Sequence, residues 1–414
     1  MTRLDRRAAW LVLGGAVALL VIGLVVLVPW HWVPHGTLRP VKESEAFTRA
    51  QVARAQARAD YVLPRSLLAT GLSLALALAL AAGPVGRRLR DRWPRRRWVL
   101  GVAAATLTYT VLRTALTTPI AWQLRGRALA DGLTTQSAGG WWADRLTSTA
   151  VSWVGLTIVV LLLIGCARRW PRRWFVPAGL GAAALVVLGS FVTPLVVEPL
   201  FNHFTPMPAG PERTALLDLA RREGVAVGDV LVADASRRTT TLNAYVSGIG
   251  SSKRLVVYDN LLKAAPADEV EAVVAHEIGH AKNHDVLVGT GLGAVGAMAA
   301  VAALALVWDT RRRRGATDLG DASAAFALVA ALAWGTFVAS PLQNAASRAV
   351  EARADRESLA ATHDAPAFEA LQKRLALRSV ADPTPWEPAQ LWWGTHPTVL
   401  QRLGLPASLA RAGE

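Results

Sequence analysis

The chain has 414 residues, 52% of them hydrophobic, and its mean hydropathy is +0.30. That value is too high for an ordinary soluble enzyme, and the apolar residues lie in long blocks, which indicates a membrane protein. The single cysteine, Cys166, excludes an intramolecular disulfide framework. The net charge of +15 comes largely from arginine clusters between the apolar blocks. Membrane orientation and anionic lipid head groups explain this placement better than nucleic-acid binding does.

The first apolar block covers residues 8–33 and follows a short basic N-terminus. It is longer than the core of a signal peptide and long enough to cross a bilayer of about 30 Å. The block ends in Pro29-Trp30-His31-Trp32, a composition typical of the membrane interface. We interpret it as an uncleaved first transmembrane helix.

Residues 41–61 are rich in alanine with scattered Arg and Glu, which predicts a polar helix outside the membrane. Four apolar runs predict the second to fifth spans, at residues 67–85, 99–122, 149–166 and 175–197. A dense basic loop at residues 87–97 follows the second span. Arg113 interrupts the third span. Because a charge is costly in lipid, Arg113 should face the protein interior or a water-filled cavity.

The sequence becomes mixed and soluble-looking at residues 198–285. Residues 213–223 have helical periodicity. Three short β-rich segments flanked by Gly or Ser predict a small sheet, at residues 230–234, 244–247 and 254–259. A helix around residue 276 follows and could run directly into a sixth span at residues 286–308, because no strong breaker separates them. A seventh span is expected at residues 322–342, before a polar helical tail.

The helix before the sixth span carries an HExxH sequence. His276 and His280 are four residues apart and share one helical face, so both imidazoles can reach one metal ion. Glu277 is positioned to act on a water molecule at that ion, which is the zincin arrangement. Small or apolar neighbours and acidic residues in the first turn suit a buried helix. The alternative is a helix with two histidines that bind nothing.

A zincin site needs a third protein ligand. Glu351 is a candidate, and Asp355, four residues later on the same helical face, can accept the free N–H of a zinc-bound histidine. The alternative is a solvated helix face, because arginines alternate with these acids. His284 we interpret as a surface or supporting residue rather than a ligand. His396 lies in a Gly- and Pro-containing loop, from which it could donate a hydrogen bond to an oxyanion.

Several separated stretches resemble the type 1 CAAX prenyl endopeptidase family and the related HtpX-type membrane peptidases. They occur in the family's order, at residues 198–206, 243–245, 256–259, 276–280 and 351–355, with His396, Pro397 and Arg402. The resemblance is specific from about Glu198 to Arg402. It is looser in the first five spans, where only the pattern of apolar runs agrees.

The resemblance implies that Glu351 is the third zinc ligand and that Asp355 supports a zinc-bound histidine. It also implies that Asn243 and Ala244 lie on a sheet edge that holds the substrate backbone by strand addition. His396 and Arg402 would then flank the zinc as transition-state or substrate contacts. The residues after the motif, 281–285, are closer to the HtpX pattern. The Ala- and Arg-rich composition suggests a bacterium, where prenylated CAAX proteins are not an expected substrate.

We therefore predict a multi-spanning α-helical membrane protein with about seven transmembrane helices and a small α+β zinc metallopeptidase domain. Residues 1–199 would form the N-terminal transmembrane region, and residues 200–414 the metallopeptidase domain with two further spans. The expected function is a zinc endopeptidase in a bacterial cell membrane, with one Zn²⁺ per chain and Glu277 as general base, acting on peptide or membrane-protein substrates. The alternatives are a quality-control protease of HtpX type and a non-catalytic metal-binding scaffold or transporter. Glu277 argues against the scaffold, because a structural zinc site needs no base.

Seven spans place the two termini on opposite sides of the membrane. The short segments on the N-terminal side carry more Lys and Arg than the opposite loops, which by the positive-inside rule puts the zinc site outside the cytoplasm. The family resemblance implies a site open to the cytosol. The sequence leaves both orientations open.

Overall fold

The computed structural model describes residues 3–84, 88, 97–248, 253–313 and 317–413. Most of the basic loop predicted at residues 87–97 lies outside them. Among the described residues, seven helical segments are long and apolar enough to cross a membrane. They are α1 (Arg6–Leu27), α3 (Arg49–Ala82), α5 (Trp98–Ala130), α6 (Ala138–Arg169), the segment Phe175–Leu200, α11 (Asp285–Arg313) and the segment Ala322–Thr362. The prediction of a multi-spanning helical membrane protein is confirmed.

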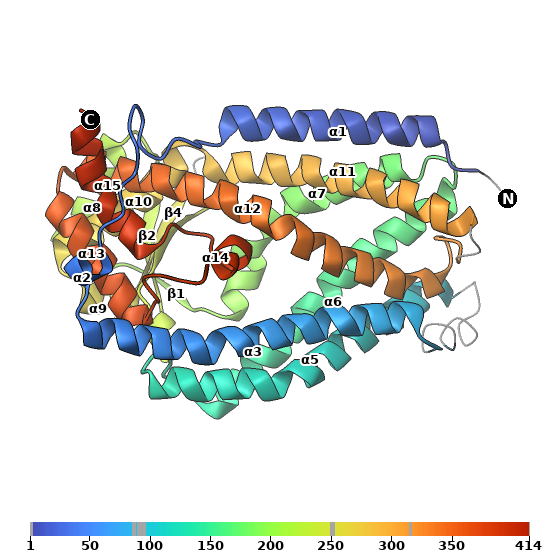
Figure 1. The fold of residues 1–414 in the computed structure, drawn as a ribbon, viewed down its shortest axis with the longest axis horizontal. Coiled ribbons are helices and arrows are strands. Elements are labelled where there is room, and N and C mark those ends of the chain that lie inside the picture. Colours follow the sequence, from blue (N-terminus) through green and yellow to red (C-terminus); the bar gives the residue numbers. More distant parts are fainter. Residues whose placement is uncertain (1–2, 85–87, 89–96, 249–252, 314–316, 414) are drawn as a thin grey trace.

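Two of these segments are composite. In the fifth span, α7 (Phe175–Val192) continues as a π-helical turn, η2 (Thr193–Val197), and a 3-10 turn, η3 (Glu198–Leu200). In the seventh, the short η6 (Ala322–Ala324) leads into α12 (Ala325–Thr362). The 38 residues of α12 reach about 57 Å at 1.5 Å per residue, well beyond a bilayer core of about 30 Å. The seventh span therefore continues into the part of the molecule that carries the sheet (Figure 1).

Two helix boundaries differ from the prediction. The first helix ends at Leu27 rather than near residue 33, because a residue that precedes proline, here Val28 before Pro29, is disfavoured in the helical conformation. The polar helix predicted at residues 41–61 is not separate from the second span. After a short α2 (Glu43–Ala46), α3 runs unbroken through Pro64. Its polar half lies beside α5, where Arg58 pairs with Asp131 at 2.8 Å.

The spans pack around one apolar core. Its largest fully buried side chains are Leu163, Ile164, Phe175, Phe326 and Leu328, from α6, α7 and α12. Helices α1 and α7 both lie against α11 (Figure 1). Burial of such side chains contributes about 1.5–3 kcal/mol each when it removes them from water. Within a membrane, the stabilisation comes instead from close packing between helices.

A four-stranded sheet lies at the C-terminal end of the bundle, in the order β1-β2-β4-β3. The three predicted strands are present as β2 (Asp229–Ala233), β3 (Ala244–Ser247) and β4 (Arg254–Tyr258). Strands β2 and β4 are parallel and the other pairs are antiparallel. The sequence analysis missed β1 (Phe204–Pro206), a three-residue strand that contains a proline, which is poorly suited to strands.

Helices cover this sheet. The predicted helix near residue 213 is α8 (Pro211–Arg222), and α9 (Asp259–Ala264) and α10 (Ala267–Lys282) follow β4. Apolar side chains of α10, including Val274 and Ile278, share a core with Leu255 and Val257 of β4. The C-terminal helices α13 (Ala365–Ser379), α14 (Glu387–Trp393) and α15 (Val399–Ala412) complete this end of the molecule.

Helices α10 and α11 do not form the single helix that the sequence left possible. α10 ends at Lys282, His284 adopts a positive φ of 54°, and α11 begins at Asp285. The Asn283 side chain donates a hydrogen bond to the Gly279 carbonyl at 2.9 Å. Side-chain bonds of this kind compete with continued helix formation, which explains the break.

The two ends of the chain lie at opposite ends of the molecule (Figure 1), as an odd number of spans requires. The segment after α1 reaches the C-terminal helices. The Val41 amide donates to the Leu400 carbonyl at 3.0 Å, and the Arg39 amide donates to Ser408 Oγ at 3.0 Å. The N-terminal segment is therefore hydrogen-bonded to α15.

Candidate metal centre

Close packing of α10 against α12 creates the site. Gly279 lies where the two helices approach, and a Cβ there would be 2.8 Å from Glu357 Cβ, closer than real side-chain contacts permit. The glycine lets α12 lie directly over the face of α10 that carries His276 and His280. The opposite face of α10 packs on the sheet, so the position of the histidines is fixed from both sides.

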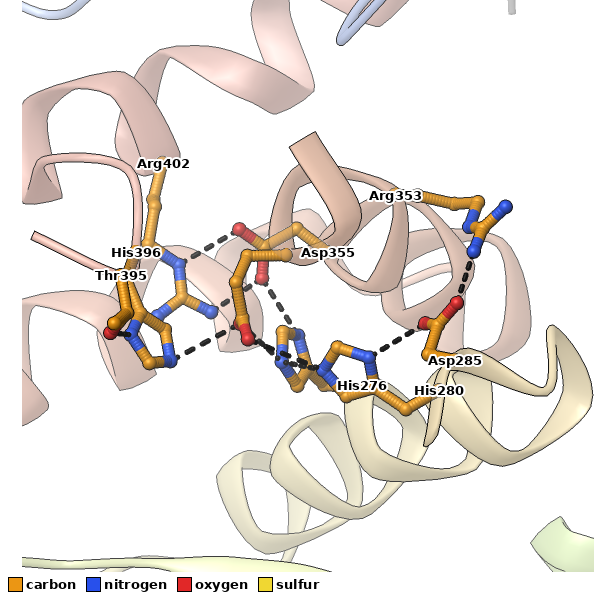
Figure 2. A network of polar contacts seen from close by, with 9 residues as sticks. His276, His280, Asp285, Arg353, Asp355, Thr395, His396 and Arg402 are labelled. Atoms are coloured by element: carbon orange, nitrogen blue, oxygen red, sulfur yellow. Dashed lines mark hydrogen bonds and ion pairs between the residues drawn. The ribbon is translucent and has the colours of Figure 1, made fainter. Parts of the chain in front are cut away.

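Three potential ligand atoms converge between these helices (Figure 2). His276 Nε2 lies 3.1 Å from His280 Nε2 and 3.2 Å from Glu351 Oε2. His280 Nε2 lies 3.7 Å from Glu351 Oε1. The three ligand atoms all lie within 4.8 Å of one another. Glu351, the third ligand that the family resemblance implies, thus lies beside the two histidines.

The other nitrogen of each imidazole faces a carboxylate. His276 Nδ1 lies 2.9 Å from Asp355 Oδ1, and His280 Nδ1 lies 2.9 Å from Asp285 Oδ2 (Figure 2). A ring that donates its Nδ1–H to a carboxylate presents the Nε2 lone pair to a metal. Two imidazole nitrogens and one carboxylate are the donor set of a catalytic zinc site, in which the fourth position stays open. The residues present therefore fit a zinc ion.

Two arginines hold these supporting carboxylates. Arg402 Nε donates to Asp355 Oδ2 at 2.8 Å, and a second guanidinium nitrogen donates to Oδ1. Arg353 donates to Asp285. Burial alone would lower the pKa of Arg402, but the negative charge of Asp355 outweighs it and raises that pKa. The Arg402 side chain is 13% exposed, so its bidentate contact fixes a buried carboxylate.

Glu277 lies one residue beyond His276 and is partly buried. It makes no hydrogen bond or ion pair within the part of the chain that the structure describes. Burial raises the pKa of the Glu277 carboxyl above its usual range. This carboxylate is engaged by none of the described side chains, and its pKa is raised. Both properties suit a group that must accept and release a proton.

His396 lies on the loop between α14 and α15, as predicted. Its Nε2 is 3.2 Å from Glu351 Oε2, and its Nδ1 is 2.9 Å from Thr395 Oγ1 (Figure 2). The side chain is 55% exposed. His396 thus lies at the open side of the site, whereas His276 is buried.

The predicted sheet edge is also present. Strand β3 lies at the end of the sheet and pairs with β4 alone among the described strands. Asn243 immediately precedes it and is exposed, while Ala244 is buried in the domain core. Tyr245 donates its hydroxyl to Glu198 Oε2 at 2.8 Å, and burial together with that carboxylate raises the Tyr245 pKa. This bond ties the edge strand to the end of the fifth span.

Asp285, Arg353 and the Tyr245–Glu198 pair were not predicted from the sequence. Asp285 follows His280 by five residues, a spacing that puts the two on different faces of a continuous helix. The break after α10 brings them together. His284 is exposed and outside the ligand cluster, as expected of a residue that is not a ligand.

Comparisons with known proteins place this site in context. Residues 213–405 match the family description "Peptidase family M48". The "Uncharacterized metalloprotease YhfN" of Bacillus subtilis (strain 168) is 25% identical over 302 residues, which cover 71% of this chain and 70% of that protein. "CAAX prenyl protease 1" of Saccharomyces cerevisiae is 32% identical over 150 residues.

The yeast alignment covers 35% of this chain and 33% of the yeast protein, so the chain spans about one third of that relative. The fold agrees over almost the whole length with the crystal structure of S. mikatae Ste24p. The TM-score is 0.73 at 17% identity, and the match covers 96% of this chain and 98% of that one.

Proposed function

We propose that the chain, whose residues 213–405 match the model of peptidase family M48, is a membrane-embedded zinc endopeptidase of CAAX prenyl protease type. The observation that carries the proposal is the convergence of His276, His280 and Glu351, next to Glu277, which pairs with none of the described residues. A structural zinc site would be closed by a fourth protein ligand and would need no base. This arrangement favours a hydrolase over a metal-binding scaffold.

His276, His280 and Glu351 would hold one Zn²⁺ per chain. When bound, the ion would polarise the scissile carbonyl and lower the pKa of a water molecule in the site. Asp355 and Asp285 keep the two imidazoles in the tautomer that presents Nε2. Arg402, which the family resemblance implies is a transition-state or substrate contact, supports the site through Asp355. A direct contact of Arg402 with substrate stays a prediction.

The remaining residues of the site transfer the proton and bind the substrate. Glu277 takes a proton from the attacking water and delivers it to the leaving nitrogen. His396, on the exposed side of Glu351, donates a hydrogen bond to the carbonyl oxygen as negative charge develops on it. The free edge of β3, at Asn243 and Ala244, pairs with the substrate backbone as an added strand.

Peptides or membrane proteins are the proposed substrates, and a bacterial cell membrane is the proposed location. Similarity to "CAAX prenyl protease 1" supports a processing enzyme that cuts defined substrates. The HtpX-like residues 281–285 and the Ala- and Arg-rich composition support a second candidate, quality control of membrane proteins. Comparing the membrane proteome with and without the active enzyme separates the two. A processing enzyme yields a few defined cleavage products, whereas loss of a quality-control protease leaves many damaged membrane proteins undegraded.

The test of hydrolysis is Glu277→Gln in purified, zinc-loaded protein in detergent, with a quenched-fluorescent peptide as substrate. The amide preserves size but accepts no proton at neutral pH, so hydrolysis should fall by at least about 100-fold. Zinc content and thermal stability should match the parent, and a chelator should abolish the parent's activity. Glu271→Gln on the same helix is the matched control, because Glu271 is partly exposed and pairs with Arg222 away from the site.

Undiminished hydrolysis in Glu277→Gln would contradict the mechanism. A parent that cleaves no peptide of a broad library would favour the scaffold.

A further inference from the structure

Two arginines that line one cavity between α5 and α6, Arg113 and Arg145, have no acidic partner among the described residues. The guanidinium group of Arg113, on α5, makes no hydrogen bond or ion pair with the described residues. Arg145 of α6 hydrogen-bonds only to threonines, through Nε to Thr118 Oγ1 at 2.8 Å and through one terminal nitrogen to Thr114 O and Thr117 Oγ1, both at 3.1 Å. An arginine within a membrane is costly and marks a functional site by default.

The level of these arginines in the membrane follows from the tryptophans of α5. Trp122 meets Trp141 edge-on at 5.2 Å and stacks on Trp142 at 6.3 Å, a cluster typical of a membrane interface. At 1.5 Å per residue, Arg113 lies about 14 Å along α5 from Trp122 and about 22 Å from Trp98 at the other end. Arg113 is therefore deep in the membrane, and Arg145, four residues from Trp141, is near the interface.

Both arginines line a polar cavity of about 350 Å³ between α5 and α6. It adjoins a cavity of about 660 Å³ enclosed by α3, α5, α6 and α12, and Arg113, Thr117 and Ser152 line both. The expectation that Arg113 faces a cavity agrees with this geometry. The larger cavity is lined mainly by apolar side chains, among them Leu74, Ile120, Leu156, Val329, Leu332 and Phe337.

The smaller cavity carries an excess of positive charge. Its one acid, Asp144, is already engaged: Oδ2 lies 3.1 Å from an Arg238 nitrogen and accepts from Gln136 Nε2 at 2.6 Å. The two guanidinium groups repel each other unless an anion lies between them. Hydroxyls of Thr149 and Ser148 line the same cavity and supply further donors.

We propose that these two cavities bind one anionic phospholipid, with its phosphate between Arg113 and Arg145 and an acyl chain in the larger cavity. Arginine forks and hydroxyl groups match the oxygens of a phosphate. On α6 the lining of the polar cavity runs from Trp141, at the interface, to Ser152. On α5 the larger cavity runs from Leu124, beside Trp122, past Arg113 to Tyr109, so an acyl chain in it lies alongside the polar cavity.

The position of the cavities argues against a peptide substrate as the occupant. None of the metal-centre residues lines either cavity. Ser340, the residue of α12 in the larger cavity that is nearest in sequence to Glu351, precedes it by 11 residues, or about 16 Å along the helix. The lipid site is thus separate from the proposed peptidase centre, and its test needs no hydrolysis.

The test is native mass spectrometry of the full-length, zinc-loaded protein in a neutral detergent with added phosphatidylglycerol. The parent should retain one phosphatidylglycerol per chain in preference to phosphatidylcholine.

Arg113→Gln and Arg145→Gln should each weaken phosphatidylglycerol binding about tenfold, the effect of losing a hydrogen bond to a charged group. Arg169→Gln is the matched control, because Arg169 is an exposed arginine at the opposite end of α6 and should leave binding unchanged. Zinc content and monodispersity report folding. Arg113→Lys, which keeps the charge, should bind better than Arg113→Gln.

Three results would overturn the proposal. The first is phosphatidylglycerol binding that is equal in the parent and both glutamine variants. The second is glycerol phosphate, which has no acyl chain, competing as well as the lipid. The third is arginine-dependent binding of an apolar peptide with a free C-terminal carboxylate, but not of its amide, without lipid binding. That result would assign the cavity to a peptide end instead.

Discussion

Asp285 and His280 meet across the break between α10 and α11, with Asp285 Oδ2 2.9 Å from His280 Nδ1. The first residue of the sixth span thereby orients one of the proposed zinc ligands. Arg353 of α12 holds the same carboxylate. The contact links the sixth and seventh spans to the metal centre through a single side chain.

The first prediction concerns this contact. Asp285→Ala should lower zinc affinity by about 10–100-fold, because the His280 ring loses the acceptor that fixes its tautomer and orientation. Competition with a chromogenic chelator measures the affinity. Asp60→Ala, at an exposed position of α3, should leave it unchanged. Equal affinities in the two variants would show that Asp285 does not support His280.

The second prediction concerns the ligand and its supporter on α12. Glu351→Ala should lower bound zinc per chain well below the parent, because a three-ligand site loses its charged member. Asp355→Ala should give an intermediate loss, since removal of a supporting carboxylate costs about 10–100-fold in affinity. Metal analysis of the purified variants measures both. Full zinc occupancy in Glu351→Ala would reject its assignment as a ligand.

The third prediction concerns the approach of α10 to α12 at Gly279. Gly279→Ala places a methyl group 2.8 Å from Glu357 Cβ and 3.5 Å from Ala354 Cα, so the helices must separate. Overpacking of this kind costs about 1–3 kcal/mol, and the displacement should also reduce zinc content. Thermal unfolding in detergent and metal analysis measure the two effects. The control is Gly291→Ala on α11, where an added Cβ meets nothing within 4 Å. Unchanged stability and zinc content in Gly279→Ala would mean that close packing here is not required.

The fourth prediction concerns orientation. The end of the bundle at which the N-terminus lies carries arginine clusters, including Arg311 to Arg313 in the last turn of α11. The positive-inside rule then puts the sheet and the metal centre outside the cytoplasm. In a Cys166→Ala background, Ala209→Cys should react with an impermeant maleimide in intact cells, while Asp318→Cys should react only after permeabilisation. Both positions are exposed. The opposite labelling pattern would put the metal centre in the cytosol.

Local patterns in the sequence were enough to predict much of this architecture. Apolar length located the seven spans, and spacings of four residues located His276, His280, Glu351 and Asp355. These signals are local, because they depend on helix geometry alone. The family resemblance was needed to choose between a ligand and a solvated face for Glu351.

Features that depend on contacts between distant segments were not predictable. The polar start of α3 stays helical because it lies beside α5, 73 residues away at the Arg58–Asp131 pair. The pairing of Asp285 with His280 requires a helix break, and residues 281–285, where the break occurs, contain no Gly or Pro that would predict it. The three-residue β1 exists through pairing with β2 despite Pro206, a case in which tertiary context outweighs strand propensity.

The separation of the ligands along the chain has a consequence for biosynthesis. His276 and Glu351 are 75 residues apart, and two membrane-spanning helices must insert between the synthesis of the first and its meeting with the second. His396 and Arg402 leave the ribosome later still, and α15 then bonds the segment after the first span through Val41 and Arg39. The proposed metal site can therefore assemble only after the seventh span has been synthesised.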